Sequence, residues 1–176
     1  MSNRPRVSLV MVSSIDGVIA EGTKEFINWS SREDKLHFAK VTREAGCVIM
    51  GSHTFDTLGR PLKDRTNIVI TSRVKEYEEK YNGVANLYFL NMKRTGDILE
   101  FAKNLGFEQV VLGGGSHINT QFAKENNIDY VYLSIEPHIA GKGINMFNDK
   151  LNLNLEFVKQ SMLNNTTILL EYKVIY

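Results

Sequence analysis

Short apolar runs recur along the chain, separated by polar or mixed stretches. Residues 7–12 and 47–50 are apolar at nearly every position, which is typical of strands buried on both faces of a sheet. Similar runs predict further strands at 18–20, 67–71, 87–90, 110–112 and 129–135. The last two runs, 155–161 and 168–175, flank the polar turn 163–166 and predict an antiparallel hairpin.

The stretches between these runs predict helices. The first begins at Ser30 or Ser31, after the apolar approach 26–29, and ends near Ala45, and Leu36, Phe38, Ala39 and Val41 supply its apolar surface. The others are expected over 52–58, 74–81, 95–104 and 116–125. Alternating strands and helices predict an α/β fold of three layers, α/β/α, with a mostly parallel central sheet and the C-terminal hairpin at one edge. No repeat or linker divides the chain, so residues 1–176 are expected to form a single domain.

Composition narrows the class of protein. The chain has 176 residues, 43% of them hydrophobic, and a formal net charge of +1, which gives no field to recruit nucleic acid or an anionic membrane. Its only cysteine, Cys47, excludes an intrachain disulfide and suits a reducing cytosol. No apolar run approaches the ~18 residues of a membrane span, and residues 1–6 lack the apolar segment of a secretory signal. A cytoplasmic domain is expected.

Three consecutive glycines, 113–115, join an apolar strand to a helix that begins at Ser116. Such a turn exposes backbone amides beside a helix N-terminus and suits an anion such as a pyrophosphate, although it can also be a plain connection. Two more strand-end loops, 51–54 and 71–73, carry groups suited to phosphate. Three such loops favour a dinucleotide over a single anion, but the spacing is not the Rossmann Gly-x-Gly-x-x-Gly.

Asp34 is the carboxylate with the strongest claim to chemistry. Three residues after Ser31, it fits a capping box, in which it would only stabilise the helix N-terminus. Alternatively, its carboxylate lies in an apolar pocket and holds an amino-pyrimidine ring through paired hydrogen bonds. Lys63 and Arg65 are either a solvated loop face or receive an anionic tail of the substrate. The four histidines lack metal-ligand spacing, so no metal is expected.

Two sets of motifs resemble known reductases. The segments 29–34, 50–55 and 58–70 are similar to dihydrofolate reductase. The segments 14–20, 112–115 and 132–147 resemble the reductase half of the bifunctional riboflavin-biosynthesis deaminase/reductase (the RibD C-terminal domain). These segments follow one another over most of the chain in a shared order, and through them the chain resembles the dihydrofolate reductase-like superfamily. The resemblance implies the fold of that superfamily and NADPH-dependent hydride transfer.

The resemblance also implies roles for particular residues. Gly51 to Thr54 and Gly113 to Ile118 match the two cofactor turns, Thr71 to Arg73 the loop at the adenosine 2′-phosphate, and Val12, Ile19 and Ala20 the nicotinamide site. The cofactor-binding positions are therefore Val12, Ile19, Ala20, Gly51, Ser52, His53, Thr54, Thr71, Ser72, Arg73, Gly113, Gly114, Gly115, Ser116, His117 and Ile118. Ser52 departs from dihydrofolate reductases, which commonly place an arginine there against the 2′-phosphate, and Arg73 is the residue that could compensate.

On the substrate side, Asp34 occupies the position of the substrate-orienting acid of dihydrofolate reductase and is the expected catalytic residue. Phe38 follows one helical turn later, Arg65 matches the folate-carboxylate arginine, and Ser134 falls at a polar strand position that faces the substrate. The expected substrate-binding residues are Trp29, Phe38, Lys63, Arg65 and Ser134.

The expected function is that of an NADPH-dependent reductase of the riboflavin-biosynthesis type, similar to 5-amino-6-(5-phosphoribosylamino)uracil reductase, acting on a pyrimidine- or pterin-type substrate. One alternative is dihydrofolate reductase itself, favoured by Trp29, Asp34 and Arg65. Another is an NADPH-binding protein without turnover. A homodimer is expected by analogy with riboflavin-type reductases.

Overall fold

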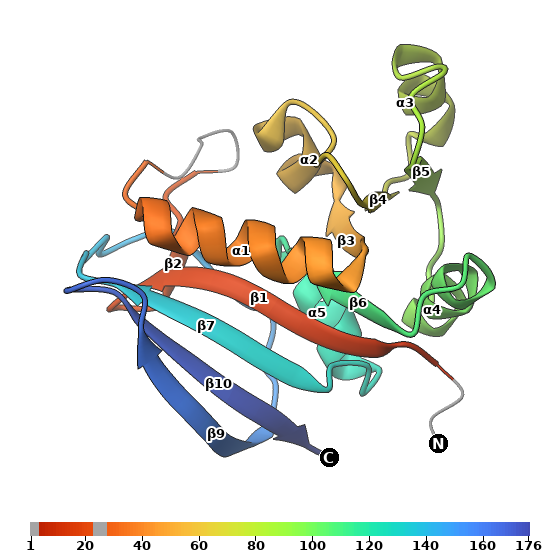
Figure 1. Cartoon of the computed structure of the whole chain (residues 1–176). Coiled ribbons are helices and arrows are strands. Elements are labelled where there is room, and N and C mark those ends of the chain that lie inside the picture. The colour runs from red at the N-terminus through yellow and green to blue at the C-terminus, as the bar shows by residue number, and fades with distance from the viewer. Residues whose placement is uncertain (1–3, 23–27) are drawn as a thin grey trace.

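The computed structural model describes residues 4–22 and 28–176 and confirms the α/β fold with a mixed, mostly parallel sheet (Figure 1). Eight strands form the central sheet in the order β5-β4-β3-β6-β1-β7-β10-β9. Neighbouring strands from β5 through β7 are parallel, and the C-terminal strands β10 and β9 are antiparallel. The strands are β1 (Arg6–Ser14), β2 (Val18–Ala20), β3 (Cys47–Gly51), β4 (Thr66–Ile70), β5 (Leu87–Leu90), β6 (Gln109–Leu112), β7 (Tyr130–Glu136), β8 (Ile144–Asn145), β9 (Asn154–Met162) and β10 (Ile168–Ile175).

Five helices in the described residues cover the two faces of this sheet: α1 (Arg32–Ala45), α2 (Ser52–Leu58), α3 (Val74–Lys80), α4 (Thr95–Asn104) and α5 (Ser116–Lys124). Because side chains alternate across a strand, β3 supplies both cores: Val48 and Met50 pack on one face, Cys47 and Ile49 on the other. The first core also receives α1, α2 and α3, and the second receives α4 and α5. The three-layer arrangement follows from this double burial.

The structure differs from the sequence expectation near β1. The expected strand covers only residues 7–12, yet β1 also includes Ser13 and Ser14, which are buried; the Ser14 hydroxyl donates a hydrogen bond to Asp16 and accepts one from the Val18 amide. The short β2 pairs with β8, which the apolar pattern did not predict. Gly143 makes this pairing possible, since a Cβ there would lie 2.5 Å from the Ala20 carbonyl oxygen.

Two further expectations concern the first helix: one is wrong, and the other falls partly on residues that the structure does not describe. Leu36 was expected on the apolar face of α1 but is 55% exposed, because its position on the helix points away from the sheet. The helix itself begins where expected, with Ser31 as its N-cap. Residues 26 and 27 of the apolar approach, like residues 1–3, lie outside the described residues.

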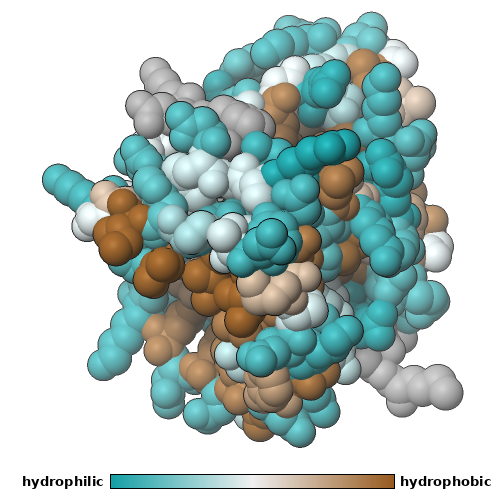
Figure 2. Space-filling model, turned by 60° about the vertical axis from the view of Figure 1, so that its left-hand side comes forward, coloured by the Kyte–Doolittle hydropathy of each residue, from teal (hydrophilic) through white to brown (hydrophobic). Residues whose placement is uncertain are grey.

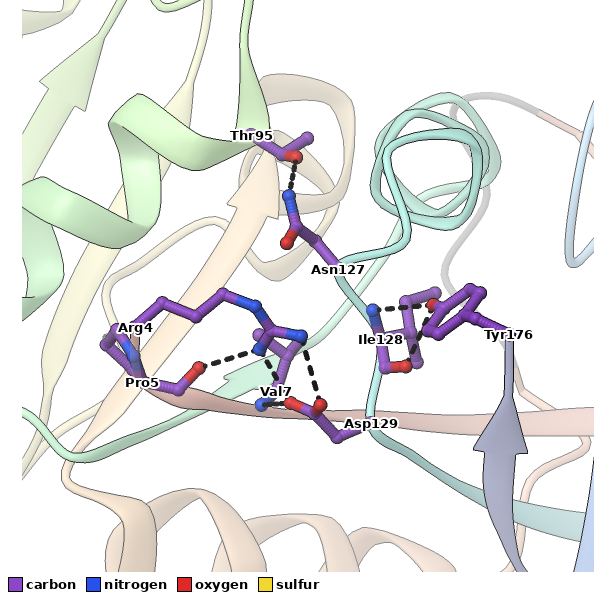
Figure 3. Close-up of polar contacts among 8 residues, drawn as sticks. All are labelled: Arg4, Pro5, Val7, Thr95, Asn127, Ile128, Asp129 and Tyr176. Carbon is purple, nitrogen blue, oxygen red and sulfur yellow. Dashed lines mark hydrogen bonds and ion pairs between the residues drawn. The ribbon is translucent and has the colours of Figure 1, made fainter. Parts of the chain in front are cut away.

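Asp129 links the N-terminal ends of the neighbouring strands β1 and β7 (Figure 3). Its carboxylate accepts two hydrogen bonds from the Arg4 guanidinium, at 2.7 and 3.0 Å, and one from the Val7 amide at 2.7 Å. The Tyr176 hydroxyl exchanges hydrogen bonds with both backbone groups of Ile128. These contacts fix the start of β1 and the end of β10, and leave the other end of the sheet for the site.

Exposed apolar side chains gather on the edge strand β9, where Leu155, Phe157, Val158 and Met162 are each about half exposed. Figure 2 shows apolar surface lying between polar side chains on the face that it brings forward. None of the helices in residues 4–22 and 28–176 is long and apolar enough to cross a membrane.

Candidate active site

The turns that follow β3 and β6 lie in direct contact. The Gly51 amide donates a hydrogen bond of 2.9 Å to the Gly114 carbonyl oxygen. A Cβ on Gly115 would lie 3.2 Å from the Thr54 hydroxyl oxygen, and one on Gly51 would lie 3.1 Å from Ile118 Cγ1. Gly114 has a φ of +90°, a conformation that L side chains rarely adopt. The two predicted cofactor turns are therefore one continuous, glycine-lined surface.

Two helices begin at this surface without side-chain caps. Gly51 is the N-cap of α2 and Gly115 is the N-cap of α5, and neither provides a hydrogen-bond acceptor for the first amides of its helix. The Ser116 hydroxyl oxygen is buried and has no hydrogen-bond partner among the described residues. Uncapped amides and an unused hydroxyl beside two positive helix ends fit a pyrophosphate, so the residues present suit a dinucleotide.

The loop after β4 holds the cation Arg73 among other charges. Its guanidinium lies 3.3 Å from the Glu76 carboxylate and 3.6 Å from the Asp56 carboxylate, and it donates a 2.8 Å hydrogen bond to the Tyr77 hydroxyl. Burial, together with the hydrogen bond to Asp56, raises the pKa of Tyr77 to about 12. An anion that binds Arg73 must therefore compete with two carboxylates.

Asp34 lies in the first turn of α1 and is only 7% exposed. Its amide donates to the Ser31 hydroxyl, as a capping box requires, but its carboxyl group lies close enough to the Ser134 side chain on β7 for that side chain to lower its pKa. Burial chiefly raises the pKa of Asp34, the nearby Glu136 carboxylate raises it further, and Ser134 and Lys35 oppose the shift. Of the two hydrogen bonds of a capping box, Ser31 and Asp34 therefore form only one, the bond from the Asp34 amide to the Ser31 hydroxyl.

The other half of that capping interaction belongs to Glu136, at the end of β7. Its Oε1 accepts a 2.7 Å hydrogen bond from the Ser31 amide, and its Oε2 accepts one of 2.7 Å from the Thr167 hydroxyl. Glu136 is 3% exposed. Glu136 received no role in the sequence analysis. The one indication in the sequence was an acidic residue in a strand whose other residues are apolar or carry hydroxyl groups.

Asp34 and the glycine turns are connected through Phe38 and β1. A Cβ on Gly113 would lie 3.4 Å from the tip of the Phe38 ring, so this side of α1 meets the β6 turn. Val12 lies opposite Ser134 in the pairing of β1 with β7. Ile19 and Ala20, the other expected nicotinamide neighbours, lie on β2, which contacts β1. The structure thus gathers the acid, the turns and these apolar positions at the carboxyl ends of parallel strands.

Trp29 is held beside the β7–β8 connection. Its ring stacks on that of His138, with centroids 5.3 Å apart, and the His138 imidazole lies 3.4 Å from the Glu21 carboxylate. Asp16 joins the same connection to the β1–β2 turn by accepting hydrogen bonds from the amides of Ala140 and Gly141. These hydrogen bonds and one from Ser14 lower the pKa of Asp16 to about 2.

The two basic residues of the loop before β4 have different surroundings. Lys63 is exposed, whereas Arg65 is 6% exposed and its guanidinium hydrogen-bonds the Lys63 carbonyl, the Ala39 carbonyl and the Thr42 hydroxyl. Arg65 therefore fastens this loop to α1. His53 and His117, in the cofactor turns, are exposed. Within the described ranges, no three His, Cys, Asp or Glu side chains come together as a metal site would require.

The fold places the paired glycine turns at the carboxyl ends of parallel strands, which is where open α/β sheets bind their ligands. A family model described as "Dihydrofolate reductase" matches residues 6–167. The chain therefore belongs to the dihydrofolate reductase family, whose members are NADPH-dependent reductases.

Individual relatives represent both branches suggested by the sequence. Dihydrofolate reductase from Ureaplasma parvum is 27% identical over 90% of this chain and 92% of its own length. RibD from Acinetobacter baumannii superposes with a TM-score of 0.84 at 17% identity, covering 98% of this chain and 59% of that one. Dihydrofolate reductase from Enterococcus faecalis, complexed with NADP(H), gives 0.74 at 21% identity and covers 97% of each chain. Such structural likeness shows the fold.

Proposed function

We propose that this protein is an NADPH-dependent reductase of the riboflavin-biosynthesis type, which transfers a hydride to a phosphoribosylamino-pyrimidine or a related pterin-like heterocycle. The observation that carries the proposal is the buried Asp34 carboxyl group. It lies near the Ser134 side chain of β7 and shares one end of the sheet with two uncapped glycine turns. A titratable group in that position, with a raised pKa, is typical of an acid that serves a reaction.

The cofactor-binding role is assigned to the two turns. The uncapped amides after Gly51 and Gly115, with the Ser116 hydroxyl, would hold the pyrophosphate. Because β3 and β6 lie between β4 and β1 in the sheet, an extended dinucleotide would place its adenosine at residues 71–73 and its nicotinamide near Val12 and β2. NADPH, when bound, supplies the hydride.

Asp34 and Ser134 would orient the heterocycle and manage the proton. A protonated Asp34 can donate a hydrogen bond, and an ionised one can accept two from an amino-pyrimidine edge. Its raised pKa keeps the proton available at a higher pH than an exposed carboxyl group would. Phe38 would pack against the ring. Lys63 and Arg65 would hold an anionic tail on the substrate, and Arg65 also fastens their loop to α1.

Dihydrofolate reductase activity is the second candidate. The placement of Asp34 in the first turn of α1, beside Ser134 on β7, favours it, since this set suits a pterin as well as a pyrimidine. Binding of NADPH without turnover is the third, and the retained acid argues against it.

Steady-state oxidation of NADPH with each heterocycle tests the proposal. We expect turnover with 5-amino-6-(5-phosphoribosylamino)uracil, and loss of that turnover in Asp34→Asn. Turnover with dihydrofolate alone, lost in the same variant, would assign the second candidate. Tight NADPH binding with neither heterocycle reduced would assign the third.

A further inference from the structure

Glu136 is a buried carboxylate where three elements meet. Its two oxygens accept hydrogen bonds from the N-cap amide of α1, contributed by Ser31, and from the Thr167 hydroxyl just before β10. Thr167 is fully buried, and Glu136 is 3% exposed. Both oxygens act as acceptors, which is the pattern of an ionised carboxylate, and the positive end of α1 favours that charge.

The Ser31 amide is the group that Asp34 would otherwise bind. In a capping box, the acid at the third helical position reaches back to the amide of the N-cap residue. Asp34 occupies that position, and its own amide already donates to the Ser31 hydroxyl at 3.1 Å. The reciprocal bond is nevertheless made by Glu136, from another element, at 2.7 Å.

We propose that Glu136 is a positioning residue for Asp34: by occupying the Ser31 amide, it releases the Asp34 carboxyl group from helix capping and leaves it free to face Ser134 and the substrate. The importance of this release for turnover rests on the proposed function, but the release itself does not. The Ser31 amide has two carboxylates to which it could donate, those of Asp34 and Glu136, and in the structure it donates to Glu136.

The arrangement has an electrostatic consequence. Glu136 adds a like charge beside Asp34, and together with burial this raises the pKa of Asp34. Ser134 on β7 and Lys35 on α1 act in the opposite direction and lower the pKa of Asp34. If Asp34 turned back to Ser31, it would gain an amide donor that stabilises its ionised form, and its pKa would fall.

A role confined to structure would make Glu136 only the link between α1 and β10. Thr167→Val separates the two roles, since it removes the bond to Thr167 and keeps the bond to Ser31. Glu136→Gln keeps an acceptor for the Ser31 amide but removes the charge. Glu136→Ala removes both, and Glu136→Asp keeps the charge on a side chain that is one methylene shorter.

The test is a carboxyl ¹³C NMR titration of Asp34 in the full chain, with its signal assigned by its absence in Asp34→Asn. We expect the pKa of Asp34 to fall in Glu136→Gln and to fall further in Glu136→Ala, where Ser31 becomes available. Thr167→Val should leave it near the wild-type value. Glu136→Asp, which serves if the alanine variant does not fold, should also lower it, although the charge remains.

The kinetic readout separates the two proposals. For a substrate that is turned over, Glu136→Ala should raise the KM about tenfold, the equivalent of one hydrogen bond, while Glu136→Gln stays within about threefold of wild type. Identical Asp34 titrations in wild type, Glu136→Gln and Glu136→Ala would overturn the positioning role. A wild-type protein that reduces neither heterocycle would overturn the proposed function, while the titration would still decide the role of Glu136.

Discussion

At the scale of single residues, burial of the Asp34 carboxyl group costs stability, a cost that its proposed role toward the substrate would explain. A carboxyl group whose pKa is raised in the folded state binds its proton more tightly there than in the unfolded chain. Its unfavourable contribution is therefore absent at pH values below the unfolded pKa of about 3.9, grows as the pH rises from there toward the folded pKa, and is constant above it. A group that the fold alone required would show the opposite sign.

The Asp34→Asn variant tests this trade-off. We expect it to unfold at a temperature a few degrees above wild type at pH 7, because the cost of the buried charge is gone, with the difference disappearing toward pH ~3. Turnover should fall by roughly two to four orders of magnitude. Thermal unfolding across the pH range, with Glu100→Gln at an exposed position of α4 as the control, measures the first effect. An equal or lower melting temperature at neutral pH would contradict the account.

The Arg73 guanidinium lies near two carboxylates that would compete with a bound phosphate. Because Glu76 lies 3.3 Å from its guanidinium, neutralising that carboxylate should free the cation for a 2′-phosphate. Glu76→Gln should bind NADPH about two- to fivefold more tightly, as expected for an exposed ion pair, and leave the affinity for NADH unchanged. Titration calorimetry measures both, and Glu79→Gln on the same helix is the matched control. A parallel gain for NADH would exclude a 2′-phosphate contact.

At the scale of elements, the hydrophobic pattern predicted most strands and helices to within a residue or two, because long apolar runs buried on both faces leave few alternatives. The β2–β8 pair was missed, since Ile144–Asn145 is too short to show a period. Within the candidate site, Asp34 and the glycine turns could be found from their neighbours in sequence. Glu136 could not, since its partners Ser31 and Thr167 are far from it along the chain.

The two glycine turns, after β3 and β6, leave little room for a side chain at Gly115. A Cβ on Gly115 would lie 3.2 Å from the Thr54 hydroxyl and would fill the space between the first turns of α2 and α5. Gly115→Ala should weaken NADPH binding by about tenfold or more with little loss of stability, because the φ of −81° at this residue suits alanine.

Fluorescence titration with NADPH measures that effect. Gly96→Ala is the control, since a Cβ there meets nothing within 4 Å, and its affinity should match wild type. Unchanged affinity in Gly115→Ala would remove the pyrophosphate from between these two turns.

At the scale of the whole molecule, the edge strand β9 is where the expected homodimer would form. It presents an unpaired edge and exposed apolar side chains, among them Val158 at 51% exposure. We expect sedimentation velocity to find a dimer at micromolar concentration and Val158→Lys to shift it toward monomer. Val84→Lys, at a residue 40% exposed and outside β9, should leave it dimeric. A wild-type monomer would refute the expectation.

The central claim is that hydride passes to a substrate whose heterocycle is held at Asp34, and isotope transfer tests it most directly. Single turnover with NADPH that carries deuterium at the transferred C4 position should place deuterium in the reduced substrate, as detected by mass spectrometry. Asp34→Asn, which keeps the cofactor turns intact, should give little or none in the same time. Oxidation of the cofactor without deuterium in the reduced substrate, or undiminished transfer in Asp34→Asn, would contradict the account.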